Sequence, residues 1–258
     1  MNLQLDGQGV VVFGAARGIG LAIATAFAAE GCRVVGFDRQ QPVHTKEGTY
    51  IEFISGDVTE IGDVQRVADL DIDIQHVVFS VGVGSGVAGF PFWNLNPSDW
   101  LRVIEVNLLG AVNVAHVFAP KLAERGQGTF LFLASVAGQT GSQTDPPYSA
   151  AKAALINFMQ CSARDLAPFG VRSNAISPGM VQSELTQSIW EASQSRLPES
   201  ERLSYQVWSE EKLRRVSPLG RWQSAEECAA MSIFLASRHA KNITGQTINI
   251  DGGQVMHS

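Results

Sequence analysis

The sequence of 258 residues predicts an α/β protein with a seven-stranded, doubly wound parallel sheet in three layers, as a single domain spanning residues 1–258. Short apolar runs alternate with longer segments of helical period, the pattern of strands joined by crossover helices. A glycine-rich turn follows the first apolar run, as in dinucleotide-binding folds. Neither a repeat of fixed period nor a Pro-rich or Ser-rich linker divides the chain.

Composition excludes several classes of function. The net charge is −6 at pH 7, with lysines and arginines scattered along the chain, which disfavours a nucleic-acid surface. The start of the chain lacks a basic segment followed by an apolar one, and no apolar run reaches the length of a membrane span. We therefore expect a cytoplasmic protein with a small-molecule substrate, without nucleic-acid or membrane partners. The three cysteines are expected to be buried and reduced, and the five histidines lack metal-ligand spacing.

The start of the chain has the pattern of a phosphate-binding unit. The apolar run 9–13 predicts a strand, residues 14–20 a glycine turn, and residues 21–30 a helix. Glycines let the backbone approach a pyrophosphate, and the helix N-terminus offers free N–H groups. The spacing G-x-x-x-G-x-G differs from the usual G-x-G-x-x-G, and a packing turn could use the same glycines.

The second strand ends on an acidic residue. Strand 32–38 ends at Asp38, 18 residues after Gly20 and close to the position of the acid that bonds an adenosine ribose. A carboxylate there accepts hydrogen bonds from a ribose diol and repels a 2′-phosphate, so it favours NAD over NADP. Arg17 and Arg39 favour NADP instead, unless they are solvated surface charges.

Later strands bring further polar residues to the same edge of the sheet, because the carboxyl ends of parallel strands lie together. Strand 51–58 contains Asp57, which could cap the next helix or bond an adenine amino group. Strand 76–82 leads into a glycine-rich loop, and a long helix from residue 97 contains Asn107. Strand 129–134 ends at Ser135.

The helix predicted over 148–167 carries Tyr148 and Lys152, which lie four residues apart and share one face. An ammonium beside a phenol favours the phenolate, which makes a usable general base. Such a pair also occurs on ordinary amphipathic helices. Here, however, Ser135 ends a strand that faces the same opening as Tyr148.

The last third closes the sheet. Strand 171–176 leads into the turn Pro178-Gly179, and residues 181–223 are the least regular part of the chain, as expected of a substrate-binding loop or lid. A capping box at Ser224 begins the last helix, and residues 246–250 form the last strand.

Taken in order, these motifs resemble the classical short-chain dehydrogenase/reductase family from end to end, which implies a Rossmann fold. Gly14-x-x-x-Gly18-Ile19-Gly20 matches the cofactor motif of that family, and Ser183 falls where a Thr often touches the carboxamide. Two departures stand out. Phe13 replaces the usual Thr, and Phe79-Ser80-Val81-Gly82 replaces the usual Asn-Asn-Ala-Gly.

The resemblance implies a role for each site residue. Tyr148 would be the base, Ser135 would donate to the substrate oxygen, and Lys152 would lower the Tyr148 pKa and bond the nicotinamide ribose. Asn107 would hold a water that relays protons, although a helix Asn can also simply bond a neighbouring carbonyl. The residues implied to contact the cofactor are Gly14, Arg17, Gly18, Ile19, Gly20, Asp38, Asp57, Val58, Ser80, Gly82, Tyr148, Lys152, Pro178, Gly179, Val181 and Ser183.

The implied activity is hydride transfer between C4 of NAD and the carbinol carbon of a secondary alcohol, and the substrate is expected to be a polyol, sugar or cyclic diol. An NADP-dependent ketone or 3-oxoacyl reductase is the alternative within the family. A dinucleotide-binding sensor without turnover is the alternative from another class. The family resemblance also implies a homotetramer.

Overall fold

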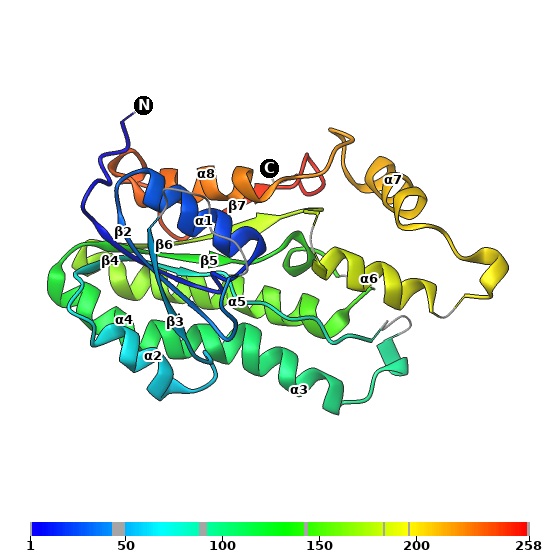
Figure 1. Cartoon of the computed structure of the whole chain (residues 1–258), viewed down its shortest axis with the longest axis horizontal. Helices are drawn as coiled ribbons and strands as arrows, with labels where there is room; N and C mark the ends of the chain where they lie inside the picture. Colours follow the sequence, from blue (N-terminus) through cyan, green and yellow to red (C-terminus); the bar gives the residue numbers. More distant parts are fainter. Residues whose placement is uncertain are drawn as a thin grey trace.

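A parallel sheet of seven strands forms the middle layer of the protein, shown as a computed structural model in Figure 1. The structure describes residues 2–42, 50–87, 92–141, 144–182, 184–195 and 197–256. The strand order is β3-β2-β1-β4-β5-β6-β7, and every neighbouring pair is parallel. The strands are β1 (Gly9–Phe13), β2 (Arg33–Asp38), β3 (Ile51–Ser55), β4 (Ile74–Phe79), β5 (Gly128–Leu133), β6 (Val171–Pro178) and β7 (Thr247–Ile250). The predicted doubly wound Rossmann fold is confirmed.

Helices cover both faces of the sheet (Figure 1). Helices α1 and α8 lie on one face, and α2, α4 and α5 lie on the other. The α-helices are α1 (Gly18–Ala29), α2 (Ile61–Ala68), α3 (Ser98–Ile104), α4 (Gly110–Arg125), α5 (Pro146–Leu166), α6 (Glu184–Gln194), α7 (Tyr205–Val216) and α8 (Ala225–Ala236). A π-helical turn, η2 (Glu105–Leu109), joins α3 to α4, and a 3-10 turn, η3 (Val136–Gly138), follows β5.

Strand β1 shows why these sequences form a central sheet. Val11 and Phe13 pack into the core on the α4–α5 side, while Val10 and Val12 pack into the core on the α1–α8 side. A strand with both faces covered needs apolar residues at consecutive positions, and β-branched valines suit it. This two-sided burial makes the edge of the sheet beyond Phe13 a rigid platform.

Phe13, which departs from the family pattern, is a core residue. Its ring is fully buried and lies 5.0 Å from that of Phe37 and 5.9 Å from that of Phe118. Aromatic pairs at these separations stabilise a core beyond their buried area. The position where the family has a Thr is therefore used here for packing between β1, β2 and α4.

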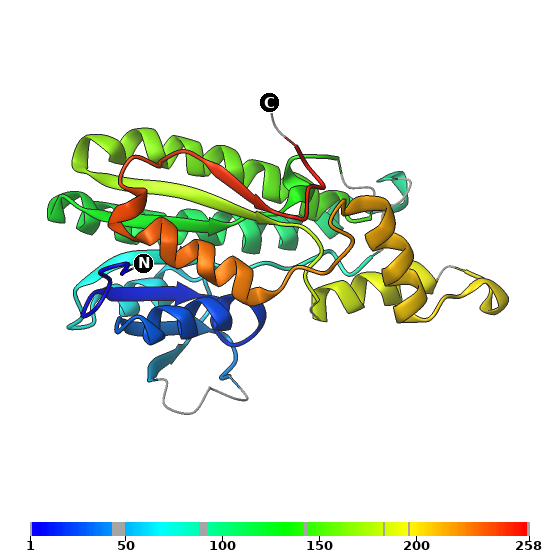
Figure 2. The ribbon, with the colours of Figure 1, turned by 90° about the horizontal axis from the view of Figure 1, so that it is seen from above.

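Three expectations about local structure need comment. The capping box is confirmed, since the side chains of Ser224 and Glu227 each bond the other's backbone N–H. The prediction that residues 181–223 are irregular is wrong, because they contain α6, a short 3-10 turn and α7. We call residues 184–195 and 197–216 the arm; in Figures 1 and 2 it projects beyond the sheet. Cys161 is exposed, so the expectation of buried cysteines fails there.

One helical run, from Ser98 to Arg125, is long and apolar enough by length and composition to span a membrane. Of its most apolar window, 44% is buried inside the protein. The core helix of a globular domain passes the same test.

His76 is a buried titratable group near the amino end of β4, away from the carboxyl ends of the strands. Its Nδ1 lies 2.8 Å from the Thr129 hydroxyl and its Nε2 lies 2.6 Å from the Gln8 side-chain oxygen. Burial, together with the positive charge of nearby Arg172, lowers the pKa of His76 to about 4. The folded protein therefore holds this ring neutral where an unfolded chain would charge it.

We predict that this group makes the free energy of unfolding depend on pH. Its contribution is complete above about pH 6.5, the unfolded pKa, and is lost as the pH falls toward the folded value, because only the unfolded chain takes up the proton in that range. Between pH 7 and pH 5 the loss from His76 is about 2 kcal/mol. Urea denaturation of His76→Gln should show a correspondingly flatter pH dependence.

The matched control is His116→Gln, since His116 is exposed on α4. It should keep the wild-type pH dependence. An unchanged pH dependence in His76→Gln would contradict the prediction.

Candidate active site

The glycine turn between β1 and α1 is shaped by close backbone approach. The N–H groups of Gly14 and Ala15 donate to the Phe37 carbonyl at 2.7 and 3.2 Å. Gly14 has a φ of +85°, and a Cβ there would lie 2.9 Å from the Ser80 carbonyl oxygen. A Cβ on Gly20 would collide with the Gly14 carbonyl. These positions therefore require glycine because three strand ends converge on them.

The same turn leaves a cradle at the start of α1. Gly18 has a φ of +55°, and nothing lies within 4 Å of where its Cβ would be. The N-cap residue Arg17 makes no side-chain cap hydrogen bond to the helix. The first-turn N–H groups of α1 thus lack a side-chain cap and point toward open space, as a pyrophosphate would need. This chain therefore fits a dinucleotide.

Asp38 ends β2 beside that cradle. Its carboxylate accepts from the N–H of Ala16 at 3.0 Å and of Gln40 at 3.2 Å. Ala16 belongs to the glycine turn, so the carboxylate is held next to the start of α1. The Asp38 carboxylate therefore lies where it could accept hydrogen bonds from the ribose next to a bound pyrophosphate, as predicted for an acid at the end of β2.

Asp57 lies on the next strand end and pairs with Arg39, with 3.4 Å between guanidinium and carboxylate. The carboxylate also accepts from the backbone N–H and hydroxyl of Thr59, at 3.0 and 2.9 Å. The interpretation of Asp57 as the N-cap of α2 is wrong, because Glu60 occupies the N-cap position. The Glu60 side chain makes no cap hydrogen bond. The aspartate instead closes a local turn.

We call residues 80–87 the β4 loop, and side chains from two helices and a helix cap hold it. The Lys152 ammonium donates to the Val81 carbonyl at 3.4 Å. Asn107 accepts from the Val83 N–H at 3.2 Å and donates to the Val83 carbonyl at 2.8 Å. The Asp145 carboxylate accepts from the Ser85 N–H at 2.8 Å.

Gly82 shows how tightly this loop passes the site. A Cβ there would lie 3.1 Å from the Asn107 side-chain oxygen and 3.2 Å from the Lys152 ammonium. The sequence Phe79-Ser80-Val81-Gly82 differs from the family pattern Asn-Asn-Ala-Gly, but it retains the glycine at the position where a side chain would crowd Asn107 and Lys152. Ser80 also remains close to the cofactor turn, since its N–H donates to the Phe13 carbonyl at 2.8 Å and its hydroxyl lies 3.3 Å from a Cβ built on Gly20.

Asn107 is fully buried inside the π-helical turn η2. Besides its two bonds to Val83, its amide donates to the Val103 carbonyl at 2.8 Å. The alternative in which this Asn bonds a neighbouring carbonyl is therefore realised. Both N–H groups of the Asn107 amide therefore donate to backbone carbonyls, as expected for a buried polar side chain.

Ser135, Tyr148 and Lys152 come together at the end of β5. The Ser135 side chain lies near enough to the Tyr148 phenol to lower its pKa. The Lys152 ammonium lies 5.6 Å from the centre of the Tyr148 ring and donates to the Leu133 carbonyl at 2.7 Å. Strand β5 and helix α5 therefore place a hydroxyl, a phenol and an ammonium around one point.

The protein's own groups raise the pKa of the Tyr148 phenol, whereas Lys152 was expected to contribute to lowering it. Burial raises the Tyr148 pKa to about 12; the Ser135 side chain lowers it and the negative charge of Asp145 raises it. Burial also lowers the pKa of Lys152 to about 7. The predicted lowering of the Tyr148 pKa by Lys152 is thus outweighed by desolvation, which disfavours charge on both side chains.

The turn at the end of β6 brings the remaining predicted residues to this edge. Pro178 ends β6, and the N–H of Gly179 donates to the Ile250 carbonyl at 2.9 Å. Val181 forms a bridge with Gln223, which joins the segment before the arm to the segment after it. Ser183 lies outside the described residues.

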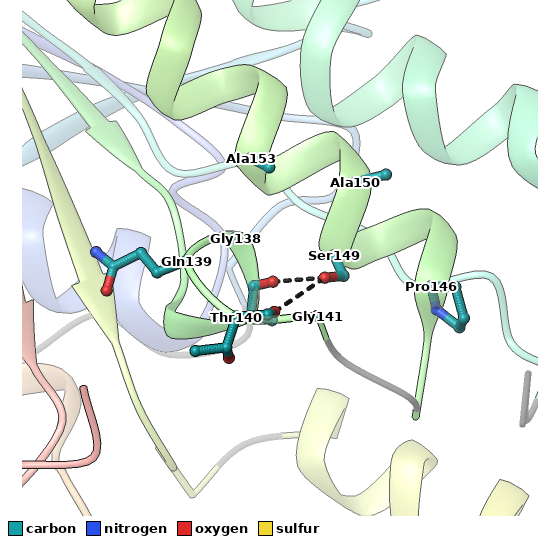
Figure 3. Close-up of a pocket in the computed structure, with 9 residues that line it drawn as sticks. Gly138, Gln139, Thr140, Gly141, Pro146, Ser149, Ala150 and Ala153 are labelled. Atoms are coloured by element: carbon teal, nitrogen blue, oxygen red, sulfur yellow. Dashed lines mark hydrogen bonds between the residues drawn. The ribbon is translucent and has the colours of Figure 1, made fainter.

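Two side chains that hold the site were not anticipated. Ser149 donates to the carbonyls of Ala137 and Thr140, at 2.5 and 3.3 Å, and so ties the turn after Ser135 to α5 (Figure 3). Asp145 caps α5 by accepting from the Tyr148 N–H at 3.3 Å. An Asp followed by two prolines is a readable helix start, so the signal for Asp145 was present in the sequence.

A pocket of about 320 Å³ lies on another face of α5 (Figure 3). Its lining residues are Ala137, Gly138, Gln139, Thr140, Gly141, Pro146, Ser149, Ala150 and Ala153. Neither Tyr148 nor Lys152 lines it, so it is separate from the cluster at the end of β5.

Known proteins match the whole length of this chain. A family model described as enoyl-(acyl carrier protein) reductase matches residues 14–255. The 3-oxoacyl-(acyl-carrier-protein) reductase of Thermotoga maritima is 30% identical over 98% of this chain and 100% of its own length. Galactitol 2-dehydrogenase of Rhizobium johnstonii is 29% identical over 98% of this chain and 96% of its own. A crystal structure of an actinorhodin polyketide ketoreductase with NADPH is 28% identical, with a TM-score of 0.84 over 97% of this chain and 98% of that one.

The fold and these relatives define an oxidoreductase that uses NAD(P) and acts on CH–OH groups or the corresponding ketones. The chain belongs to the short-chain dehydrogenase/reductase family.

We predict that Asn107→Ala lowers the free energy of unfolding by about 2–3 kcal/mol, because it leaves the half-buried N–H and carbonyl of Val83 without the Asn107 partner and removes a buried bond to the Val103 carbonyl. Urea denaturation measures this loss. Asn113→Ala is the matched control: Asn113 lies on α4, is only half-buried, and donates to the carbonyls of Val58 and Thr59. An equal loss in both variants would show that Asn107 has no special part in holding the β4 loop.

Proposed function

We propose that the protein is an NAD-dependent dehydrogenase that interconverts a secondary alcohol and its ketone through Ser135, Tyr148 and Lys152. The observation that carries this proposal is the meeting of three side chains: Ser135 lies near the half-buried Tyr148 phenol, and the buried Lys152 ammonium lies 5.6 Å from the Tyr148 ring. A purely structural helix has no use for a buried lysine beside a tyrosine near the end of a central strand.

The dinucleotide would be held by the glycine turn, Asp38, the β4 loop, Lys152 and the turn after β6. We include among its contacts Asp57 with Val58, Pro178 with Gly179, and Val181. When bound, the nicotinamide ring supplies the acceptor or donor of the hydride.

In this proposal Tyr148 moves the proton at the substrate oxygen. During alcohol oxidation its phenolate removes the hydroxyl proton, and during ketone reduction its phenol returns it. The Ser135 hydroxyl donates to the same oxygen and stabilises negative charge as it develops there. Asn107 is proposed to hold a water of a proton relay through its side-chain oxygen, since both of its N–H groups bond the Val83 and Val103 carbonyls.

The energetics indicate how many positive charges the phenolate needs. Bringing the Tyr148 pKa from about 12 to neutrality requires roughly 7 kcal/mol of differential stabilisation. One unit charge at about 4 Å supplies roughly 4 kcal/mol at an effective dielectric constant near 20. The Lys152 ammonium alone therefore falls short, and the positive charge of oxidised NAD is the second contribution.

The preference for NAD is supported by the charges at the end of β2. The Asp38 carboxylate is fixed beside the cradle by two backbone N–H groups, and it would repel a 2′-phosphate. Arg39, one of the two arginines that would attract such a phosphate, is paired with Asp57; Arg17 is the other. The polyketide ketoreductase structure contains NADPH, and two sugar-acid dehydrogenase structures of the same fold contain NADP, so NADP is the alternative cofactor.

The proposed substrate is a polyol, sugar or cyclic diol, as for the galactitol dehydrogenase among the relatives. The arm supplies aromatic rings for such a ligand. The Tyr205 ring lies 5.8 Å from Trp190, 6.0 Å from Trp208 and 6.3 Å from Trp222. A pocket that combines aromatic walls with a few polar groups is typical of small-molecule sites. Reduction of a 3-oxoacyl thioester, the activity named for the Thermotoga maritima relative, is the alternative.

We also propose a cytoplasmic homotetramer. Leu101 and Leu109 stand eight residues apart on the α3–α4 helical run and are 71% and 50% exposed, which supports an interface on this face. Gel filtration that shows a monomer would remove this part of the proposal.

We predict that Tyr148→Phe lowers turnover by at least about a thousandfold while NADH binding is retained, because it removes the proton-transferring group and little else. Initial rates with NAD and NADP over a panel of sugars, polyols, cyclic diols and secondary alcohols give the first quantity, and NADH fluorescence gives the second. Tyr50→Phe is the matched control, since Tyr50 is 82% exposed. Equal activity in both variants would remove Tyr148 from the mechanism. Cofactor binding without turnover in the wild type, on alcohols and ketones alike, would favour a sensor.

We predict that Asp38→Asn raises the ratio of kcat/KM for NADP to that for NAD by about tenfold or more, because a carboxylate that repels the 2′-phosphate is removed. Asp71→Asn removes the same charge from an exposed position in the loop that enters β4, at the other edge of the sheet, and should leave the ratio unchanged. A wild-type preference for NADP would overturn the assignment of Asp38.

A further inference from the structure

Asp145 connects the β4 loop to the first turn of α5, two segments whose relative position matters for the proposed reaction. One carboxylate oxygen accepts from the Ser85 N–H at 2.8 Å, and the other accepts from the Tyr148 N–H at 3.3 Å. The first bond reaches the β4 loop and the second reaches the first turn of α5. The carboxylate is thus a direct link between the loop that passes the site and the residue proposed to move the proton.

We propose that Asp145 is a positioning residue for Tyr148: its carboxylate fixes the β4 loop against the start of α5, and its negative charge opposes loss of the phenol proton. This inference rests on the proposed function for its catalytic consequence. Its electrostatic part concerns the protein alone.

The carboxylate acts on Tyr148 through both charge and geometry. The negative charge of Asp145 is one of the causes that raise the Tyr148 pKa, alongside burial. Removing a carboxylate near an acidic group favours its charged form, because a like charge no longer repels it. The helix cap fixes the distance over which this repulsion acts, since Asp145 precedes Tyr148 by one turn of α5.

The other charged groups around Tyr148 are few among the described residues. Lys152 faces it from α5 itself. The segments packed on that side, η3 and β5, carry no charged residue, and Arg172 of β6 lies at the far end of its strand. On α3 and η2, which also pack against α5, Arg102 and Glu105 are exposed to solvent, and the half-buried carboxylate of Asp99 accepts from the Asn96 N–H. Asp145 is therefore the carboxylate that opposes Lys152 at the phenol.

This balance has a chemical consequence. Asp145 favours the protonated phenol, which is the form that ketone reduction uses. Lys152 favours the phenolate, which is the form that alcohol oxidation uses. Removing the carboxylate should shift the pH at which oxidation reaches half its maximum downward by about one unit, which corresponds to up to about tenfold faster oxidation below that pH.

The first experiment measures the phenol directly in the free protein. The chain has three tyrosines, so ¹³C labelling of the ring Cζ gives three NMR signals, and Tyr148→Phe identifies one of them. In Asp145→Asn the Tyr148 signal should begin to titrate about one pH unit lower than in the wild type. Asn keeps an acceptor for the Tyr148 N–H and is itself a good N-cap, so the helix start is retained.

Matched variants separate charge from damage to the fold. Asp99→Asn removes a carboxylate that accepts a backbone N–H, from Asn96 at 2.9 Å, at the start of α3, and it should leave the Tyr148 titration unchanged. If Asp145→Asn does not fold, Asp145→Ser serves instead, because Ser is also a preferred N-cap and carries no charge. An unchanged Tyr148 signal in the folded Asp145 variant, or the same shift in Asp99→Asn, overturns the inference.

The pH profile of alcohol oxidation then tests the catalytic consequence. A lowered midpoint in Asp145→Asn, with the wild-type midpoint in Asp99→Asn, is the expected result. An unmoved midpoint despite a moved NMR signal overturns the catalytic part of the inference. A moved NMR signal in a protein that turns over no alcohol or ketone would uphold the electrostatic inference and overturn the proposed function.

Discussion

The buried ammonium of Lys152 is the group on which the arrangement of this site depends. It donates to the Leu133 carbonyl at the end of β5 and to the Val81 carbonyl beyond β4, and it lies under the Tyr148 ring. A lysine with 2% of its surface exposed needs such acceptors, because desolvation alone lowers its pKa to about 7. Two strand ends and a helix are thus tied together through one cation.

The opposing desolvation of Tyr148 and Lys152 makes the site a poised acid–base pair. Burial raises the Tyr148 pKa and lowers that of Lys152, so the free protein holds the phenol protonated. Converting the phenol into a base then requires additional positive charge. In such a site Tyr148 would become a base only when the positively charged nicotinamide ring is bound beside it. The negative charge of Asp145 makes this requirement stronger.

The sheet and its motifs could be predicted from the sequence because their signals are local. Strand β1 is apolar at every position since both of its faces are buried, and the capping box at Ser224 lies within four residues. Asp38 and Ser135 follow from the rule that ligands bind at the ends of parallel strands. These features need no knowledge of distant contacts.

The rest depends on distant contacts or on burial. The link from Asp145 to Ser85 joins residues 60 positions apart, which no spacing reveals. Asp57 could not be told from a helix cap until its pairing with Arg39 was seen. Helices α6 and α7 were missed because they interrupt the alternation of strands and helices that builds the sheet, and few of their described residues are buried. The raised pKa of Tyr148 was not predicted from the sequence. A neighbouring lysine can be recognised from residue spacing, but the loss of solvent around the phenol cannot.

The most direct test of this account is the titration of Tyr148 by ¹³C NMR with and without saturating NAD in the oxidised form. The account predicts that the midpoint falls from near 12 in the free protein by several pH units when NAD is bound, since a second positive charge then joins Lys152 beside the phenol. A midpoint that does not move on NAD binding would contradict the assignment of Tyr148 as the base.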